Sequence, residues 1–335
     1  MSEDSRPIMV SIQCLVYNHE PYIRQCLDGF VAQKTNFRFE AIVHDDASTD
    51  GSAGIIKEYA EKYPDIIKPV LESENQYKKH DGSLRKIVME HLKGKYIALC
   101  EGDDYWIDPM KLQKQVNYME AHPECTMTCN RTKLFSELQK KDVGENFCYD
   151  ASRIVEVKDI IQRGGLFIST CSIMYRKSVM DDYPDYCRQC HVGDYPLQIY
   201  AAMKGKVYYF NDIMSVYRVE NSASWIGQRK AIDIEKRIST VSSEVRMLEG
   251  FAIDYPEYGS FFKQRIGAYI NNNFPDRKNS IVDQNKYLHA FAKEIADYSL
   301  FWKLDLLIRR IRIKGVMRLY PYRDLKKYRN KKDCE

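Results

Sequence analysis

The chain has 335 residues, of which 44% are hydrophobic and 29% are charged, and its formal net charge is +4. These proportions are ordinary for a soluble globular protein and allow one large or two medium domains. So small a net charge gives no support for a nucleic-acid-binding protein.

The sequence shows no segment that resembles an export signal or a membrane-spanning helix. Residues 1–7 are polar and acidic and do not resemble a signal peptide, and no apolar run approaches the roughly 20 residues that span a bilayer. Ten cysteines are spaced irregularly, so we expect reduced, buried thiols in a cytoplasmic protein. Cys187, Cys190 and His191 match the haem-attachment string C-x-x-C-H, but that attachment belongs to exported proteins, so thiols are expected here too.

In the first 120 residues, β-branched and apolar runs alternate with helical spacing of apolar residues. We expect strands at 9–16, 37–43, 66–71 and 96–100, and helices at 23–30, 55–60, 84–92 and from Asp108-Pro109 onward. Strands and helices that alternate roughly every 20 to 30 residues predict βαβ units and a doubly wound, mostly parallel sheet.

After about residue 125 the pattern is less regular. It predicts strands at 125–130, 168–175, 207–210 and 214–218, and helices at 194–203 and 228–250. Further helices are expected over 255–319.

Polar and acidic clusters follow three of the predicted strands. They are Tyr17-Asn18-His19-Glu20, Asp45-Asp46 and Glu101-Gly102-Asp103-Asp104. The carboxyl ends of parallel strands share one edge of a sheet, where open α/β folds bind ligands. An aromatic ring, acid pairs and a hard divalent cation suit a nucleoside diphosphate. The alternative is that these acids only cap helices or are solvated.

The segments Val10–Asn18, Val43–Ser52 and Glu101–Trp106 resemble family 2 glycosyltransferases of the inverting, bacterial polysaccharide type. The resemblance covers about residues 8–225. It implies a GT-A-like domain over 1–225, with a nucleotide-sugar half at 8–125 and an acceptor half at 126–225. Its fold would be a doubly wound, mostly parallel sheet with helices on both faces, followed by a helical extension over 226–335.

The resemblance also implies roles for residues that bind the donor. Tyr17 and Glu20 would lie near the nucleobase and ribose, Asp46 would contact the base with Asp45 beside it, and Arg85 would contact phosphate or ribose. Asp103 and Asp104 would hold a divalent metal, Mn²⁺ or Mg²⁺. Glu101 replaces the usual Asp of that motif, which leaves its role open.

Two further segments resemble the family in the second half of the chain. Gly193-Asp194-Tyr195-Pro196-Leu197 is similar to the family's Glu-Asp-x-x-Leu segment, which implies that Asp194 is the general base and that Gly193 replaces the Glu. The segment that begins Tyr217-Arg218 is similar to one that lies over the diphosphate, so Arg218 would add positive charge there.

These features predict transfer of a sugar, with inversion, from a nucleoside diphosphate sugar to a hydroxyl of a glycan or lipid-linked glycan. A UDP-sugar is the expected donor. A sugar nucleotidyltransferase is a weaker alternative, because the loop after the first strand lacks glycine and basic residues. A binding module without catalysis is the third.

The basic tail is a separate feature. Residues 301–335 hold 12 Lys or Arg and 4 Asp or Glu, a local charge of +8 that leaves −4 for the preceding 300 residues. Apolar and basic residues alternate there, which is typical of a helix on an anionic membrane surface. We therefore expect either peripheral contact with the inner face of the membrane or a solvated basic helix packed on the domain.

Overall fold

The computed structural model describes residues 6–79, 81–220, 233–275, 280–297 and 303. Its contacts divide the chain into two compact units, Met1–Tyr269 and Ile270–Glu335. Apart from Lys303, the predicted membrane-binding tail lies outside the described residues. Among the helices that are described, none is long and apolar enough to cross a membrane.

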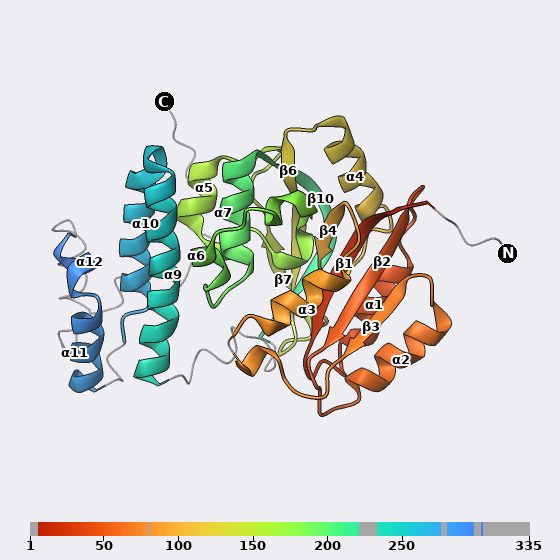
Figure 1. Ribbon diagram of the computed structural model, residues 1–335, viewed down its shortest axis with the longest axis horizontal. Helices are drawn as coiled ribbons and strands as arrows, with labels where there is room; N and C mark the ends of the chain where they lie inside the picture. The colour runs from red at the N-terminus through yellow and green to blue at the C-terminus, as the bar shows by residue number, and fades with distance from the viewer. Residues whose placement is uncertain (1–5, 80, 221–232, 276–279, 298–302, 304–335) are drawn as a thin grey trace. The chain divides into compact units, whose positions relative to one another are not determined.

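Four parallel strands form the first half of the sheet, as the sequence predicted (Figure 1). They lie in the order β3-β2-β1-β4, and their bounds are β1 Ile8–Val16, β2 Arg38–Asp45, β3 Ile67–Leu71 and β4 Tyr96–Leu99. All four residues of β4 are buried. Continuous apolar runs of this kind form strands that are covered on both faces.

Helices cover both faces of this half. Alternate residues of β4 belong to different cores: Tyr96 and Ala98 pack in one, Ile97 and Leu99 in the other. Helices α1 (Ile23–Val31), α2 (Ser52–Lys62) and α4 (Lys111–Ala121) contribute to the first core, and α3 (Ser83–His91) contributes to the second. The predicted doubly wound arrangement is thereby confirmed.

The second half of the sheet is mixed. Its long strands β6 (Cys125–Ser136) and β10 (Lys206–Val219) are parallel to each other, and β9 (Met174–Arg176) joins them to β4 by antiparallel pairing. Short antiparallel partners lie beside them: β5 (Tyr105–Trp106), β7 (Lys141–Asn146) and β8 (Arg153–Ile154).

Two predicted strand assignments in this half were wrong. The segment 168–175 is a strand only from Met174 onward, because a 3-10 turn at Thr170–Ser172 precedes it. The two strands predicted at 207–210 and 214–218 are one strand, β10, whose register with β6 shifts between Phe210 and Ser215. Polar residues at that bulge resemble a turn in the sequence.

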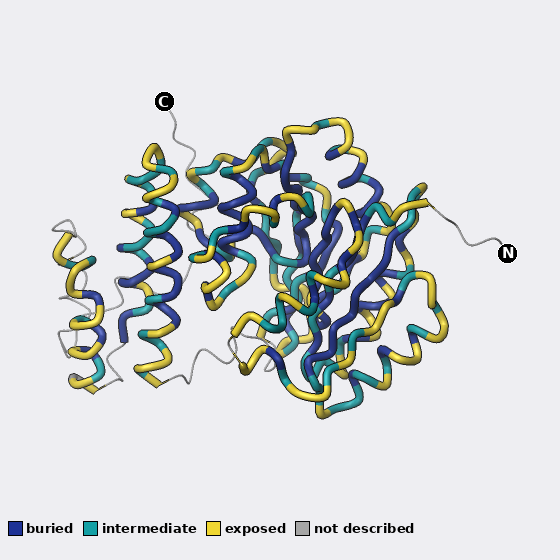
Figure 2. The backbone as a smooth tube through the Cα atoms, viewed as in Figure 1, coloured by how far each residue is buried: buried dark blue, intermediate teal, exposed yellow. Residues whose placement is uncertain are grey.

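The remaining helices follow the predicted order, and α5 and α6 were not predicted. They are α5 (Val157–Arg163), α6 (Asp185–Arg188), α7 (Asp194–Lys204), α9 (Ile234–Asp254) and α10 (Gly259–Asn272), and the second unit contains α11 (Ile281–Ala290) and α12 (Ala292–Ala296). Figure 2 shows the buried side of α9, where Met247, Leu248 and Phe251 join the core of the first unit. That unit therefore continues past residue 225, where the family resemblance ends.

Candidate active site

The loops that carry the predicted acids meet at one edge of the sheet. β1 is parallel to both β2 and β4, so all three strands end on the same side. The backbone N–H of Asp46 donates to the carbonyl of Val16 (2.9 Å), and that of Gly102 donates to the carbonyl of Leu15 (3.0 Å). The loops after β2 and β4 are thus both hydrogen-bonded to the end of β1.

The loop after β1 carries Tyr17 and Glu20. Tyr17 is half-buried, and the Lys78 ammonium lies 5.5 Å from the centre of its ring. The exposed Glu20 carboxylate accepts a hydrogen bond from the backbone N–H of Gly51 (2.8 Å), immediately before α2. Glu20 therefore interacts with the start of α2, and the nucleotide-binding roles of both residues stay predictions.

Asp45 and Asp46 are both buried at the end of β2. Asp46 accepts hydrogen bonds from the backbone N–H groups of Gln76 (2.6 Å) and Tyr77 (3.1 Å), which follow β3. Asp45 accepts from the N–H of Ser48 (3.0 Å) through Oδ2, while its buried Oδ1 has no partner among the described residues. Neither side chain caps α2, so the helix-capping alternative does not explain this pair.

Asp103 and Asp104 follow β4 and are 7% and 1% exposed. Oδ1 of Asp104 accepts a hydrogen bond from the backbone N–H of Arg218 on β10 (2.8 Å). Oδ2 is buried and has no partner within the described part of the chain. Burial, and then the charge of Asp103, raise the pKa of Asp104 well above its usual range. A buried carboxylate with an unused oxygen is suited to a cation.

A metal at this loop would be shared with the substrate. Where the structure describes the chain, no group of three His, Cys, Asp or Glu residues is arranged to hold a metal ion. Mg²⁺ is commonly held by one or two carboxylates together with substrate phosphates. Asp103 and Asp104, whose Oδ2 is unused within the described residues, fit that mode of binding. A diphosphate would supply the other ligands.

Glu101 opens the same loop with an exposed side chain. Partial removal of its carboxylate from water raises its pKa, and the negative charges of Asp103 and Asp194 raise it further. The predicted base Asp194 thus acts electrostatically on the loop that carries the predicted metal ligands. The structure brings together side chains that are about 90 positions apart in the sequence.

Asp194 is the first residue of α7 and is partly buried. Its Oδ2 accepts a hydrogen bond from the Thr170 hydroxyl (3.0 Å), and its Oδ1 accepts one from the N–H of Tyr195 (2.8 Å). Burial raises the pKa of Asp194, and these two hydrogen bonds partly oppose the rise. A raised pKa suits a carboxylate that must accept a proton.

A substitution at Thr170 tests how its hydrogen bond affects the pKa of Asp194. Replacing Thr170 by Val removes the donor to the carboxylate, so the pKa of Asp194 should rise further. The acidic limb of the pH–rate profile should then move to higher pH, because activity is lost as pH falls through the pKa of the base. Thr170→Ser keeps a hydroxyl and should leave the limb in place. An unchanged limb in Thr170→Val would contradict the coupling.

Tyr217 is a site residue that the sequence did not single out. Burial, and then the charges of Asp104, Glu101, Asp103 and Asp194, raise its pKa. Its phenol therefore lies within electrostatic reach of all four carboxylates. Its place next to Arg218 on β10 was visible in the sequence, but no pattern indicated that the four carboxylates would all act on this phenol.

Arg218 is 5% exposed, and its guanidinium is already engaged. It donates to the Glu137 carboxylate (2.7 Å), the Gln25 side chain and the carbonyl of Asp103, and it lies 4.6 Å from the centre of the Tyr105 ring. These contacts join the acidic loop to β10. The predicted role at the diphosphate stays a prediction, while the contacts show a residue that positions Asp103 and Asp104.

Loss of Arg218 should therefore destabilise the protein. Arg218→Met leaves Glu137, whose side chain is 9% exposed, with Lys140 (2.5 Å) as its one charged partner among the described residues, and breaking a buried pair costs about 3 to 5 kcal/mol. Because Lys140 remains, we expect about 3 kcal/mol less free energy of unfolding in urea. Adding Glu137→Gln should restore part of it. If the Arg218→Met protein is as stable as the wild type, the ion pair between Arg218 and Glu137 does not stabilise the fold.

Within the described residues, the contacts of Arg85, on α3, are with Tyr183 and the space beside Gly193, and not with the loops that follow β1 and β2. Its guanidinium carbon is 5.3 Å from the centre of the Tyr183 ring, and Nη2 is 4.0 Å from the point where a Cβ on Gly193 would lie. The structure thus places Arg85 beside the residue that precedes Asp194. Its predicted contact with a phosphate or ribose stays a prediction.

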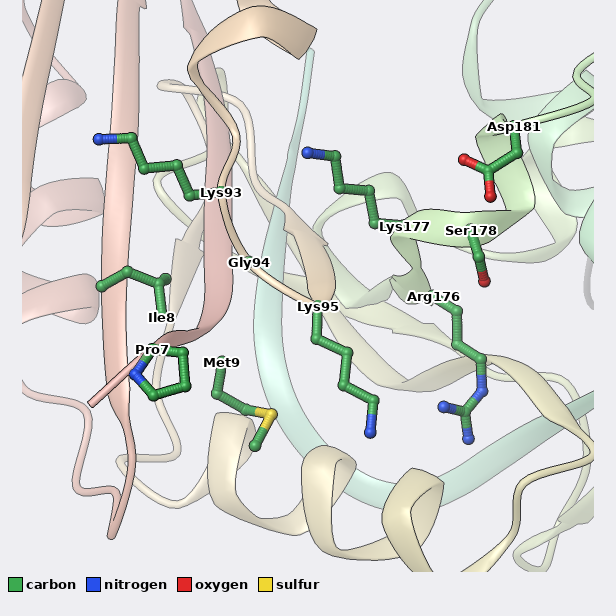
Figure 3. A pocket seen from close by; sticks show the side chains of 10 residues that line it. All are labelled: Pro7, Ile8, Met9, Lys93, Gly94, Lys95, Arg176, Lys177, Ser178 and Asp181. Atoms are coloured by element: carbon green, nitrogen blue, oxygen red, sulfur yellow. The ribbon is translucent and has the colours of Figure 1, made fainter.

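A hollow of about 690 Å³ lies elsewhere in the molecule (Figure 3). Segments 7–9 and 93–95, together with Arg176, Lys177, Ser178 and Asp181, line it. Residues 7–9 and 93–95 lie at the amino ends of β1 and β4, so this hollow is at the opposite edge of the sheet from the acids. None of the predicted site residues lines it.

Comparison with known proteins agrees with the motifs. Residues 11–183, just over half of the chain, match the family described as Glycosyl transferase family 2. "Putative glycosyltransferase EpsH" of Bacillus subtilis is 38% identical over 314 residues, which cover 93% of this chain and 80% of EpsH. An uncharacterized protein of Mycobacterium tuberculosis is 39% identical over 216 residues, which cover 64% of this chain. The match spans about 60% of that relative's own length.

Solved structures share the fold. Residues 1–349 of Staphylococcus aureus TarS, in complex with UDP-GlcNAc, align with a TM-score of 0.52 and 17% identity, over 87% of this chain and 89% of that one. The mannosyltransferase PcManGT from Pyrobaculum calidifontis, in complex with GDP-Man and Mn²⁺, has the same TM-score and identity, over 91% and 80%. The GT-A fold is thereby confirmed, and with the matched sequence it shows that this chain belongs to glycosyl transferase family 2.

Proposed function

We propose that the protein transfers a sugar from a nucleoside diphosphate sugar, a UDP-sugar being the expected donor, to an acceptor hydroxyl with inversion. The observation that supports this most is the gathering of Glu101, Asp103, Asp104 and Asp194 around Tyr217 at one edge of the sheet. It combines a site for a diphosphate with a carboxylate that can accept a proton. The UDP-GlcNAc and GDP-Man complexes of TarS and PcManGT agree with this class of donor.

In this proposal Asp194 accepts the proton of the acceptor hydroxyl while that oxygen attacks the anomeric carbon. Thr170 and the N–H of Tyr195 hold the carboxylate in place. General-base assistance of this kind contributes about a hundredfold to ten-thousandfold in rate. Direct attack by the acceptor on the carbon that carries the diphosphate inverts its configuration.

Asp103 and Asp104 would hold Mn²⁺ or Mg²⁺ on the donor diphosphate. The bound metal would supply Lewis-acid stabilisation of the negative charge that develops on the departing nucleotide. Arg218 keeps Asp104 oriented through the backbone hydrogen bond between β10 and the acidic loop. The complex of PcManGT with Mn²⁺ supports use of a divalent cation in this fold.

We further propose a glycan or lipid-linked glycan as the acceptor, in the synthesis of a cell-surface polysaccharide. The resemblance to polysaccharide-type transferases supports this choice. Contact with an anionic membrane through residues 301–335 remains a prediction from the sequence. It is tested by sedimentation with anionic and neutral vesicles, with a chain that ends at residue 300 as the control.

A screen of donors tests the proposed activity. Several UDP- and GDP-sugars are incubated with the protein and Mn²⁺ or Mg²⁺, and release of the free nucleotide is measured with and without candidate acceptors. We expect release from one group of donors only, and none in EDTA. Nucleotide binding without release from any donor would favour a binding module, and formation of a sugar nucleotide from a nucleoside triphosphate would favour a nucleotidyltransferase.

A further inference from the structure

Arg85 is a cation that forms no ion pair with a carboxylate in the part of the chain that the structure describes. It is half-buried on α3, and its Nη1 is fully buried and has no hydrogen-bond partner within the described ranges. No ion pair joins its guanidinium to a carboxylate of the described residues. A charge held in this way costs free energy unless something else neutralises it.

The groups that feel the charge of Arg85 are themselves neutral. They include the phenol of Tyr183, over whose ring the guanidinium lies, and the thiol of Cys187. Burial raises the pKa of both groups, so neither supplies a negative charge at neutral pH. Among the described residues, the groups that contact this cation are therefore uncharged, and no carboxylate there balances its charge.

Gly193 leaves room beside this guanidinium. A Cβ at Gly193 would have only Nη2 of Arg85 within 4 Å, at 4.0 Å. The backbone of Gly193 has φ −99° and ψ −33°, a conformation that any residue adopts, so backbone strain does not require a glycine here. The glycine is exposed, and no other described residue fills the space between its Cα and the Arg85 guanidinium.

This space lies next to the proposed base. Asp194 follows Gly193 directly, and its carboxylate is held by Thr170 and Tyr195 and not by Arg85. A group bound to Arg85 would therefore lie close to the hydroxyl that Asp194 deprotonates, without removing the negative charge of the base. Guanidinium groups bind carboxylate and phosphate through two parallel hydrogen bonds.

We propose that Arg85 and the gap at Gly193 form an anion subsite for a carboxylate or phosphate ester on the transferred sugar or on the acceptor. The proposal rests on the proposed function and narrows its substrates to a class in which one sugar is acidic. It separates this anion from the donor diphosphate, which we place at Asp103 and Asp104.

Substitutions at Gly193 test the subsite with charge and volume separated. Gly193→Glu places a carboxylate beside Arg85, Gly193→Gln fills the same volume without charge, and Gly193→Ala adds one methyl group. Gly54→Glu adds the same charge on α2, where nothing lies within 4 Å of the new Cβ. Thermal unfolding of each variant confirms that it is folded before binding is measured.

The probes are free glucuronate, methyl phosphate and UDP, and their dissociation constants are measured by titration calorimetry. Loss of a charged hydrogen-bonding partner lowers affinity by roughly ten- to a hundredfold. We expect the affinity for glucuronate or for methyl phosphate to fall by this factor in Gly193→Glu and in Arg85→Gln. Gly193→Gln should lose less affinity, and Gly54→Glu should bind these anions as the wild type does. Glucuronate and methyl phosphate distinguish a carboxylate subsite from a phosphate subsite, and UDP affinity should stay within about twofold in all Gly193 variants.

Equal affinity of the wild type and Gly193→Glu for both small anions would overturn the subsite. So would a parallel loss of UDP affinity, because it would place the donor diphosphate at Arg85. These measurements need no turnover, so they remain informative if the donor screen shows no transfer. In that case anion binding that depends on Arg85 would survive while the proposed activity would fail.

Discussion

Asp194→Asn should slow sugar transfer by about a hundredfold or more while leaving nucleotide binding intact. The amide keeps an oxygen that can accept the hydrogen bond from Thr170 or Tyr195, so the geometry of α7 should survive, but an amide does not accept a proton at neutral pH. General-base assistance contributes about a hundredfold to ten-thousandfold, and we expect kcat to fall within that range. UDP affinity, measured by titration calorimetry, should be unchanged.

A matched control is available on α6. Asp185 is also the first residue of a helix, and its side chain is 88% exposed. Asp185→Asn should retain full activity. Turnover by Asp194→Asn equal to that of the wild type would remove Asp194 from the mechanism, and loss of both turnover and UDP affinity would indicate a binding role.

Asp104→Asn should remove the effect of divalent metal on donor binding. The asparagine oxygen can still accept the backbone N–H of Arg218, whereas the buried Oδ2 is replaced by an amide nitrogen that binds no cation. Without metal, the variant should be at least as stable as the wild type, because burial and the charge of Asp103 already disfavour the Asp104 carboxylate. Its activity should fall by about a hundredfold or more, as expected when the transition-state charge on the diphosphate is no longer stabilised.

Thermal unfolding with UDP, with and without Mn²⁺, checks this prediction. A ligand at about a hundred times its dissociation constant stabilises the folded state by about 2.7 kcal/mol. The wild type should show an additional increase when Mn²⁺ joins UDP, and Asp104→Asn should not. Wild-type protein in EDTA should behave like the variant. Full activity in EDTA would remove the metal from the proposed mechanism.

Strands β1 to β4 could be predicted because each is a short, nearly continuous apolar run that ends at polar residues. Strands β2 and β4 are buried on both faces, so the local pattern and the final burial agree there, whereas the edge strand β3 is mostly exposed. The segment before β9 alternates apolar and hydroxyl residues, and it turns. Within that turn the Ser172 hydroxyl donates to the carbonyl of Ser169 (2.6 Å), and the indole of Trp106 donates to the carbonyl of Cys171 (2.8 Å). A contact between residues 65 positions apart leaves no local mark in the sequence.

Some residues of the candidate site could be predicted from the sequence, and others could not. Asp45, Asp46, Asp103 and Asp104 could be predicted because each pair follows a parallel strand, and their common edge follows from that topology. Asp194 begins a helix, and only the family resemblance indicated it. The hydrogen-bond partners of Arg218 could not be predicted, because Gln25 lies 193 positions away in the sequence and Glu137 lies 81 positions away. Thr170 was equally hidden, because it lies in a segment that was expected to be a strand. Tyr217 becomes part of the site only once β10 is placed beside the acidic loop.

The configuration of the released sugar is the most direct test of the proposed reaction. A donor selected in the screen is incubated with the protein and metal, with an acceptor or with water alone, and the first-formed anomer is read by proton NMR before it equilibrates. We expect the anomer opposite to that of the donor, and about a hundredfold to ten-thousandfold slower product formation by Asp194→Asn. Retention of the donor's configuration, or equal product from the Asp194→Asn protein, would contradict inverting transfer assisted by Asp194.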